Sequence, residues 1–195
     1  MIHTSVVLIL IGCPGLMVVG HQMDNMAATF AGYAMAMYAF ALAPKRPGLA
    51  GFLLGGSWVI VLLSSSLLEL SFLVLMSLVL PSFAHWRNRS YLISLAFAFI
   101  LAVPFGLVWP LSLKAQLPQV FDLWWQNFAW HGLGTTKQSI TFNDLGYYLV
   151  VLSWFTFPAW LLTLWTLFFK RQNTTAPALQ LCIVWFVLGW LMLTF

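Results

Sequence analysis

A group of polar side chains that could do chemistry stands immediately before a long apolar segment, and consists of His21, Gln22, Asp24 and Asn25. An aspartate in this place can cap the following helix, because its carboxylate accepts backbone N–H bonds and suits the positive end of the helix dipole. A carboxylate at a membrane surface can also bind a cation or act on a hydroxyl. Spacing alone favours the cap, and the two roles are compatible. His21 more commonly serves as an interfacial polar residue than as a ligand.

Glu69, in the stretch SSSLLELSF, is the second candidate. A carboxylate this close to hydrocarbon is costly unless it is paired or hydrated, which would suit a residue that binds a substrate. The serines before it could equally cap a helix whose first turn contains Glu69. Both interpretations stay open from the sequence.

The third group is aromatic and lies in a long stretch between apolar runs, residues 114–145. Apolar residues recur at helical spacing over 118–130, which predicts a short amphipathic helix lying in a membrane interface. Trp124 and Trp125 would offer a platform for a sugar ring or a lipid, although tryptophan more often anchors a helix at the interface. His131 and Lys137, further along, could contact a phosphate or simply face water.

The familiar signatures of self-sufficient catalysis are missing from the sequence. It contains no P-loop, no GxSxG, no HExxH and no CxxC pair. Cys13 and Cys182 both stand inside apolar runs, where they are expected to be small packing residues. No metal site is therefore predicted from the residues themselves.

The elements that must position these residues are membrane helices. The chain is 62% hydrophobic and only 6% charged, whereas a soluble domain has about a quarter charged residues. A soluble protein this apolar would expose large patches and aggregate. The basic residues come in short pairs between apolar runs, so the net charge of +4 indicates membrane topology and no nucleic-acid partner is expected.

A membrane-spanning helix needs about 20 apolar residues. The sequence predicts an all-α fold, a polytopic membrane helical bundle of about seven transmembrane helices with one outer amphipathic loop helix, forming a single transmembrane domain over 1–195. The predicted spans are 5–19, 25–43, 49–65, 67–84, 91–113, 146–169 and 176–195.

Orientation follows from the charges. Three basic pairs follow the second, fourth and sixth predicted spans: Lys45 and Arg46, Arg87 and Arg89, Lys170 and Arg171. With seven spans they fall on one side, which the positive-inside rule makes cytoplasmic, so the amino terminus is expected in the cytoplasm. The acidic residues then lie on or near the outer face: Asp24, Glu69, Asp122 and Asp144.

Several stretches follow one another in an informative order. An aspartate opens a predicted helix of small and apolar residues in HQMDNMAATFAGYAMAMYAFAL. A glycine-rich helix pair is predicted in GLAGFLLGGSWVIVLLSSSLLELSF. AVPFGLVWPLSL precedes FDLWWQNFAWHGLG, a loop with a Trp- and Asn-containing helix, and GYYLVVLSWFTFPAWLLTLW follows it. This order resembles the central membrane region of bacterial glycosyltransferases of the protein O-mannosyltransferase and lipid A aminoarabinose transferase superfamily, which are family 39-like and have the C-type glycosyltransferase fold.

The resemblance implies transfer of a sugar from a polyprenyl-phosphate carrier to a hydroxyl or phosphate of a lipid or protein, on the outer, periplasmic face of the bacterial inner membrane. A carboxylate would deprotonate or orient the acceptor, and cationic groups, sometimes with a divalent metal, would hold the phosphate. Asp24 would be the second acidic residue of that site and the catalytic candidate. The residues expected to bind substrate are His21, Glu69, Trp124, Trp125, Asn127, His131 and Lys137.

The chain departs from the family at several places. The family's main catalytic carboxylate lies in an outer loop that would precede this sequence, and its Leu-Thr-Lys-Gly turn is replaced here, with Ser65 at the lysine position. The chain is therefore expected to be a central fragment or a degenerate relative, either truncated or working with a companion chain that supplies the missing acid. The alternative is a non-catalytic membrane subunit or lipid-binding scaffold. A small transporter is disfavoured, because the charges lie at the membrane edges.

Overall fold

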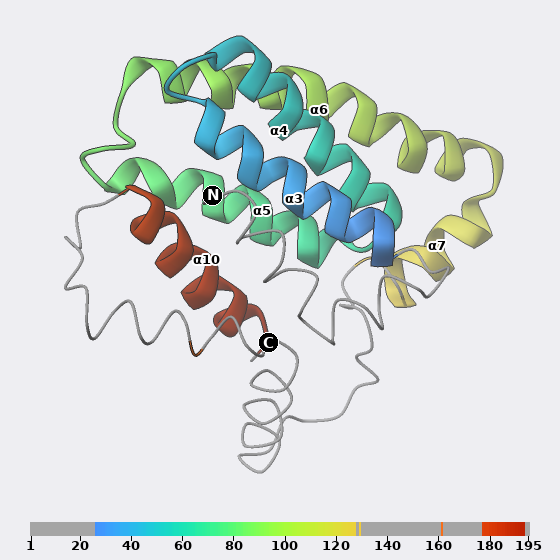
Figure 1. The fold of residues 1–195 in the computed structure, drawn as a ribbon. Helices are drawn as coiled ribbons and strands as arrows, with labels where there is room; N and C mark the ends of the chain where they lie inside the picture. Colours follow the sequence, from blue (N-terminus) through green and yellow to red (C-terminus); the bar gives the residue numbers. More distant parts are fainter. Residues whose placement is uncertain (1–25, 128, 130–160, 162–176, 194–195) are drawn as a thin grey trace. The chain divides into compact units, whose positions relative to one another are not determined.

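The computed structural model describes residues 26–127, 129, 161 and 177–193, and over these residues it contains helices and no strand (Figure 1). The prediction of an all-α fold is confirmed for this part of the chain. The elements are α3 (Met26–Leu42), α4 (Pro47–Ser64), α5 (Leu67–Val79), the 3₁₀-helix η1 (Leu80–Ser82), α6 (Arg89–Gln116), α7 (Pro118–Asn127) and α10 (Pro177–Leu193). Residues 28–136 and 177–195 belong to one compact unit, which contains these helices apart from the first two residues of α3.

Each predicted apolar segment in the described part coincides with a helix, and the predicted amphipathic helix coincides with α7. The predicted spans 5–19 and 146–169 lie outside the described residues, apart from Leu161. Two described helices, α4 and α6, are long and apolar enough to cross a membrane by length and composition. The apolar helices Met26–Leu42, Leu67–Ser82 and Leu179–Gly189 are shorter. These findings give weak support to membrane association, and seven spans remain a prediction.

The helix boundaries follow from local chemistry. Pro47 stands in the first turn of α4, where its missing N–H costs nothing. Ser66 caps α5 by accepting the N–H of Glu69 at 3.4 Å, and Asn88 caps α6 by accepting the N–H of Tyr91 at 2.8 Å. These two caps fix the residues at which α5 and α6 begin.

The one predicted span that the structure divides is 67–84. The α-helix ends at Val79 and a 3₁₀ turn containing Pro81 replaces its last turn. Proline has no N–H and cannot continue the i to i−4 ladder, so the predicted span consists of an α-helix followed by a 3₁₀ turn.

The tightest helix contact is between α4 and α6. A Cβ placed on Gly51 would lie 2.5 Å from the carbonyl oxygen of Ser94, and one on Gly55 would lie 2.8 Å from the carbonyl oxygen of Ala98. Glycines four residues apart thus let two backbones approach closely, as in small-residue contacts of membrane helices. Because residue numbers increase together along this contact, α4 and α6 run parallel.

Helix α6 extends beyond α4. Gly106 of α6 lies beside Leu62, close to the end of α4, so the remaining residues of α6 project past it. Its 28 residues correspond to about 42 Å at 1.5 Å per residue, compared with a hydrocarbon core of about 30 Å. The projecting part is the platform on which α7 packs.

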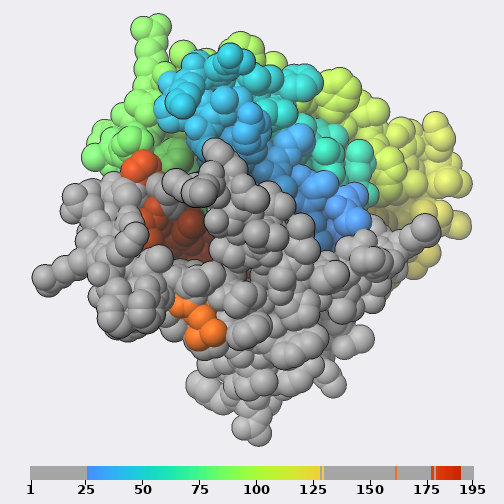
Figure 2. Space-filling view, in the orientation of Figure 1, coloured from blue at the N-terminus to red at the C-terminus, as the bar shows by residue number. Residues whose placement is uncertain are grey.

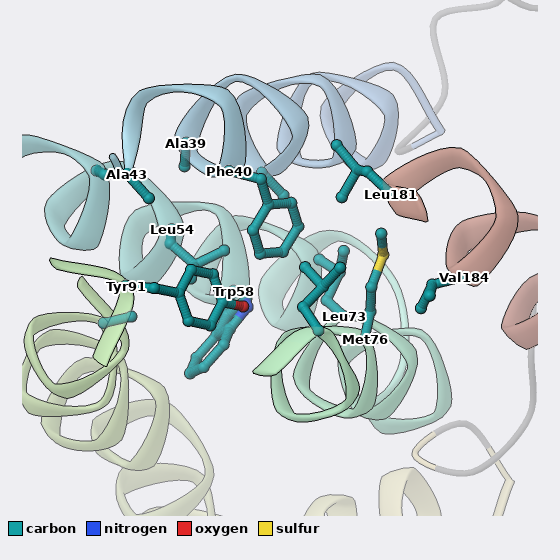
Figure 3. Packing of buried hydrophobic residues seen from close by; sticks show 14 of the residues in the cluster. Ala39, Phe40, Ala43, Leu54, Trp58, Leu73, Met76, Tyr91, Leu181 and Val184 are labelled. Carbon is teal, nitrogen blue, oxygen red and sulfur yellow. The ribbon is translucent and has the colours of Figure 1, made fainter. Parts of the chain in front are cut away.

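Buried apolar side chains from α3, α4, α5, α6 and α10 meet between the helices (Figure 3). Leu181 and Val184 of α10 join this core, and Trp185 makes an edge-on contact with Phe72 of α5 at 5.1 Å between ring centroids. The largest fully buried side chains include Phe40, Leu54, Trp58, Leu73, Met76 and Tyr91.

The outward surface of α6 is apolar. Its side chains are more exposed than those of a soluble core helix, with Ile100 at 70%, and α3, α4 and α6 lie open on the face drawn in Figure 2. A soluble protein rarely exposes a continuous apolar patch of this kind. The exposed large side chains of this helix include Leu92, Phe97, Ile100, Val103, Phe105, Leu107, Val108 and Leu111.

Candidate functional site

Polar side chains gather at one end of the described unit, where α3 begins, α4 ends and α5 begins. Tyr33 of α3 donates its hydroxyl to Oε2 of Glu69 on α5 at 2.8 Å. The hydroxyl oxygens of Thr29 on α3 and Ser64 at the end of α4 are 3.0 Å apart. These hydrogen bonds join three helices through polar atoms, and we call this region the polar end.

Glu69 stands in the capped first turn of α5, and its carboxylate also has a hydrogen-bond partner. Its backbone N–H takes part in the cap formed by Ser66, while its half-buried carboxylate accepts the hydroxyl of Tyr33. The partner is neutral, so the carboxylate at the start of α5 keeps its capacity to accept further hydrogen bonds. The position in the first turn also places it at the positive end of the helix dipole.

The ring of Tyr33 is held in place by two aromatic neighbours. Phe72 of α5 and Trp185 of α10 both meet it edge-on, with centroids 6.0 and 5.6 Å away. Since the ring is fixed, its hydroxyl is aimed at Glu69. Tyr33 is a residue that the sequence did not indicate. The side chain of Tyr33 is half-buried, and a tyrosine hydroxyl removed from water usually has a hydrogen-bond partner, but that partner could not be found without the fold.

The aromatic helix α7 folds back along the projecting end of α6. Trp124 meets Trp109 of α6 edge-on, at 5.0 Å between centroids and 84° between planes. Phe121 stacks on Trp125 at 6.1 Å, and Nζ of Lys114 lies 5.6 Å above the ring of Phe121. Trp109 is the second residue that the sequence did not indicate, and it is what orients Trp124.

Ala129, two residues after the end of α7, is bonded to the polar end. The N–H of Leu67, the first residue of α5, donates to the carbonyl of Ala129 at 2.8 Å. The N–H of Ala129 in turn donates to the carbonyl of Trp124 at 2.9 Å. Glu69 and the aromatic helix, far apart in the sequence, are thereby brought to the same end of the unit.

The other predicted site residues divide into two groups. Trp124 is half-buried and Trp125 is exposed, whereas the exposed Asn127 donates its amide to the carbonyl of Leu123 in its own helix at 3.0 Å. The remaining candidates lie outside the described residues, so the structure does not place them: His21, Asp24, His131 and Lys137.

The side chains described at this end can form hydrogen bonds and stack on a ligand. They offer the carboxylates of Glu69 and Asp122, several hydroxyls and aromatic faces, a combination suited to a ligand that has hydroxyl groups and an apolar surface. Within 26–127 and the described part of α10, no group of three His, Cys, Asp or Glu side chains could hold a metal ion.

No family model, curated protein or solved structure matches the chain. Its function must therefore be inferred from the described geometry and from the residues themselves.

Proposed function

We propose that the chain is a multi-pass protein of the bacterial inner membrane whose outer end binds a polyprenyl-phosphate-linked sugar, as part or as a degenerate relative of a glycosyltransferase. The observation that carries the proposal is the Leu67–Ala129 hydrogen bond, which brings the aromatic helix α7 to the end that contains Glu69. A carboxylate at the same end as aromatic side chains suits a sugar on a lipid carrier, because sugars offer hydroxyl groups to the one and apolar faces to the other.

The membrane part of the proposal is supported by the apolar exposed face of α6, by its length, and by the close glycine contact between α4 and α6. Charge supports the orientation. Four of the described basic residues flank the starts of α4 and α6, at the opposite end from Glu69: Lys45, Arg46, Arg87 and Arg89. The positive-inside rule makes that end cytoplasmic and the polar end periplasmic.

In the proposed site, the carboxylate of Glu69 accepts hydrogen bonds from sugar hydroxyls, while Tyr33 holds it in position. Trp124 and Trp125 supply the stacking surface. From the resemblance alone, Asp24 is proposed as the carboxylate that orients the acceptor, and His21, Asn127, His131 and Lys137 as further binding groups. The main catalytic acid of the reaction is proposed to come from a preceding part of the same protein or from a companion chain, and phosphate departure would use cationic groups or a divalent metal.

Binding to the reconstituted full chain tests this proposal. The probe is a fluorescent polyprenyl-phosphate sugar, compared with the same polyprenyl phosphate without a sugar. Glu69→Gln is expected to weaken sugar-lipid binding by about tenfold or more, because it removes a charged hydrogen-bond acceptor. The matched control is Asp122→Asn, an exposed carboxylate on α7, which should bind normally. Absent binding, or equal loss in both variants, would contradict the proposal.

A second candidate is a non-catalytic subunit or lipid-binding scaffold, and Ser65 favours it. Its hydroxyl is buried and has no hydrogen-bond partner among the described residues, where the resembled family has a lysine that could hold phosphate. A scaffold is expected to bind the polyprenyl phosphate equally well with and without the sugar, and to be insensitive to Glu69→Gln.

Topology is tested separately, in a background with Cys13→Ser and Cys182→Ser. An impermeant maleimide added outside spheroplasts should label Gln126→Cys on α7 and should leave Arg87→Cys unlabelled until the membrane is permeabilised. The reverse pattern would overturn the orientation without affecting the fold.

A further inference from the structure

The strongest charged feature of the described surface lies at the end opposite Glu69. Two connections contribute to it, one between α3 and α4 and one between η1 and α6, and all four basic side chains are exposed. We call this group the basic patch: Lys45, Arg46, Arg87 and Arg89. The proposed sugar-lipid site does not use it.

The helix geometry brings the two connections together. Gly51 of α4 contacts Ser94 of α6, and the two helices run parallel. Arg46 stands five residues before Gly51 and Arg89 five residues before Ser94, a rise of about 7.5 Å in each helix. The two arginines therefore lie at about the same height along the common direction of α4 and α6.

A second contact ties the end of α3 to the same place. Phe40 of α3 stacks on Tyr91 of α6, with ring centroids 6.5 Å apart and 24° between planes. Tyr91 also meets the buried Trp86 edge-on at 5.7 Å. The residues that follow Phe40 and those that precede Tyr91 are thus held close by packed side chains.

The patch has no acidic neighbour in the described part of the chain. The acidic residues there are Glu69 and Asp122, in α5 and α7 at the other end. The amino-terminal, positive ends of the parallel helices α4 and α6 point into the same region and add to the positive field.

Apolar side chains begin within one turn of the basic residues. Leu49 and Phe52 of α4 are 45% and 60% exposed, and Leu92 and Ile93 of α6 are 53% and 36% exposed. A lipid with an anionic headgroup and acyl chains matches a cationic surface that adjoins an exposed apolar one. A soluble anion would leave the apolar side chains in contact with water.

We propose that the basic patch binds the headgroups of anionic phospholipids of the cytoplasmic leaflet, with the acyl chains lying on the exposed faces of α4 and α6. The inference rests on the membrane orientation in the proposed function and is independent of the sugar-lipid site. Its effect is to fix the depth at which the α4–α6 pair sits in the bilayer.

The test uses the full chain reconstituted in phosphatidylcholine bilayers that contain a trace of spin-labelled lipid. Spin-labelled phosphatidylglycerol should associate with the protein more strongly than spin-labelled phosphatidylcholine. Arg46→Gln with Arg89→Gln should lower this preference by up to about fivefold for each charge removed. Arg46→Lys with Arg89→Lys keeps the charge and should keep the preference, which separates charge from folding.

Lys114→Gln is the matched control, because it removes one exposed basic residue at the other end of α6. An unchanged preference in the glutamine double variant, or an equal loss in Lys114→Gln, would overturn the proposal. So would competition by inorganic phosphate at moderate ionic strength, which would identify a soluble-anion site. Failure of the wild-type chain to enter pure phosphatidylcholine bilayers would instead overturn the membrane assignment, before any anionic lipid is added.

Discussion

The hydroxyl of Tyr91 donates a hydrogen bond to the backbone carbonyl of Ser77 at 2.7 Å. In a continuous helix that carbonyl would accept the N–H four residues later, which belongs to Pro81 and does not exist. The tyrosine at the start of α6 thus supplies the donor that the proline at the end of α5 lacks. Both Tyr91 and Ser77 are buried, so the substitution of one donor for another keeps a backbone acceptor satisfied.

Tyr91→Phe is expected to destabilise the protein by about 1–3 kcal/mol, because it leaves a buried carbonyl without a donor. Pro81→Ala offers a backbone N–H to the same carbonyl, so it should recover part of the loss when combined with Tyr91→Phe. The measurement is a double-mutant cycle of unfolding free energies in mixed detergent micelles. Additive effects of the two substitutions would show that the proline and the tyrosine are independent.

This pair also shows where sequence reasoning reached its limit. Hydrophobicity located the described helices other than α7, which the helical spacing of its apolar residues predicted, since long apolar segments bounded by proline, serine or basic residues leave few alternatives. It extended the fourth predicted span to residue 84, because Leu80 and Phe83 are as apolar as the helix before them. Only the spatial position of Tyr91 explains why the chain tolerates a break there.

The glycine contact between α4 and α6 is expected to be intolerant of a single methyl group. In Gly55→Ala, the added Cβ would lie 2.8 Å from the carbonyl oxygen of Ala98, which is backbone and cannot yield easily. We expect a loss of about 1–3 kcal/mol in unfolding free energy.

The neighbouring Gly56 provides the matched control. Its added Cβ would meet only the flexible end of Met35 at 3.4 Å, so Gly56→Ala should be neutral or, through helix propensity, stabilising by up to about 1 kcal/mol. Equal effects of the two substitutions in the same micelle titration would mean that α4 and α6 do not pack through this face.

The attachment of α7 to α6 is testable through its tryptophan pair. Trp109→Ala and Trp124→Ala should each loosen α7, and the coupling between them should be about 0.5–1.5 kcal/mol, as for other edge-on aromatic pairs. Limited proteolysis provides a second readout, since a released α7 should be cut faster near Asn127. Zero coupling would show that the two rings do not act together.

The candidate site was partly foreseeable. Glu69 stood out because a carboxylate is rare beside hydrocarbon, and the Trp-rich segment stood out by its composition. Their convergence was expected only from the count of predicted spans, whereas the structure supplies it through the bond between Leu67 and Ala129. Tyr33 and Trp109 gave no signal, because an aromatic residue in an apolar helix has many possible neighbours and the sequence does not name them.

A substitution at Tyr33 can separate a structural role of its hydrogen bond to Glu69 from a role in ligand binding. Tyr33→Phe keeps the ring against Phe72 and Trp185 and removes only the hydroxyl. We expect a stability loss of about 1–3 kcal/mol, because the bond involves a charged acceptor. Tyr38→Phe is the matched control, since Tyr38 belongs to the same helix and is 61% exposed, and it should have no measurable effect.

If Tyr33 also positions the carboxylate for a ligand, Tyr33→Phe should weaken binding of the polyprenyl-phosphate sugar while binding of the sugar-free lipid stays at the wild-type level. A purely structural tyrosine would weaken both ligands in proportion to the loss of folded protein, which the unfolding titration measures independently. A variant with reduced stability and an unchanged ratio of the two affinities would therefore restrict Tyr33 to holding α3 against α5.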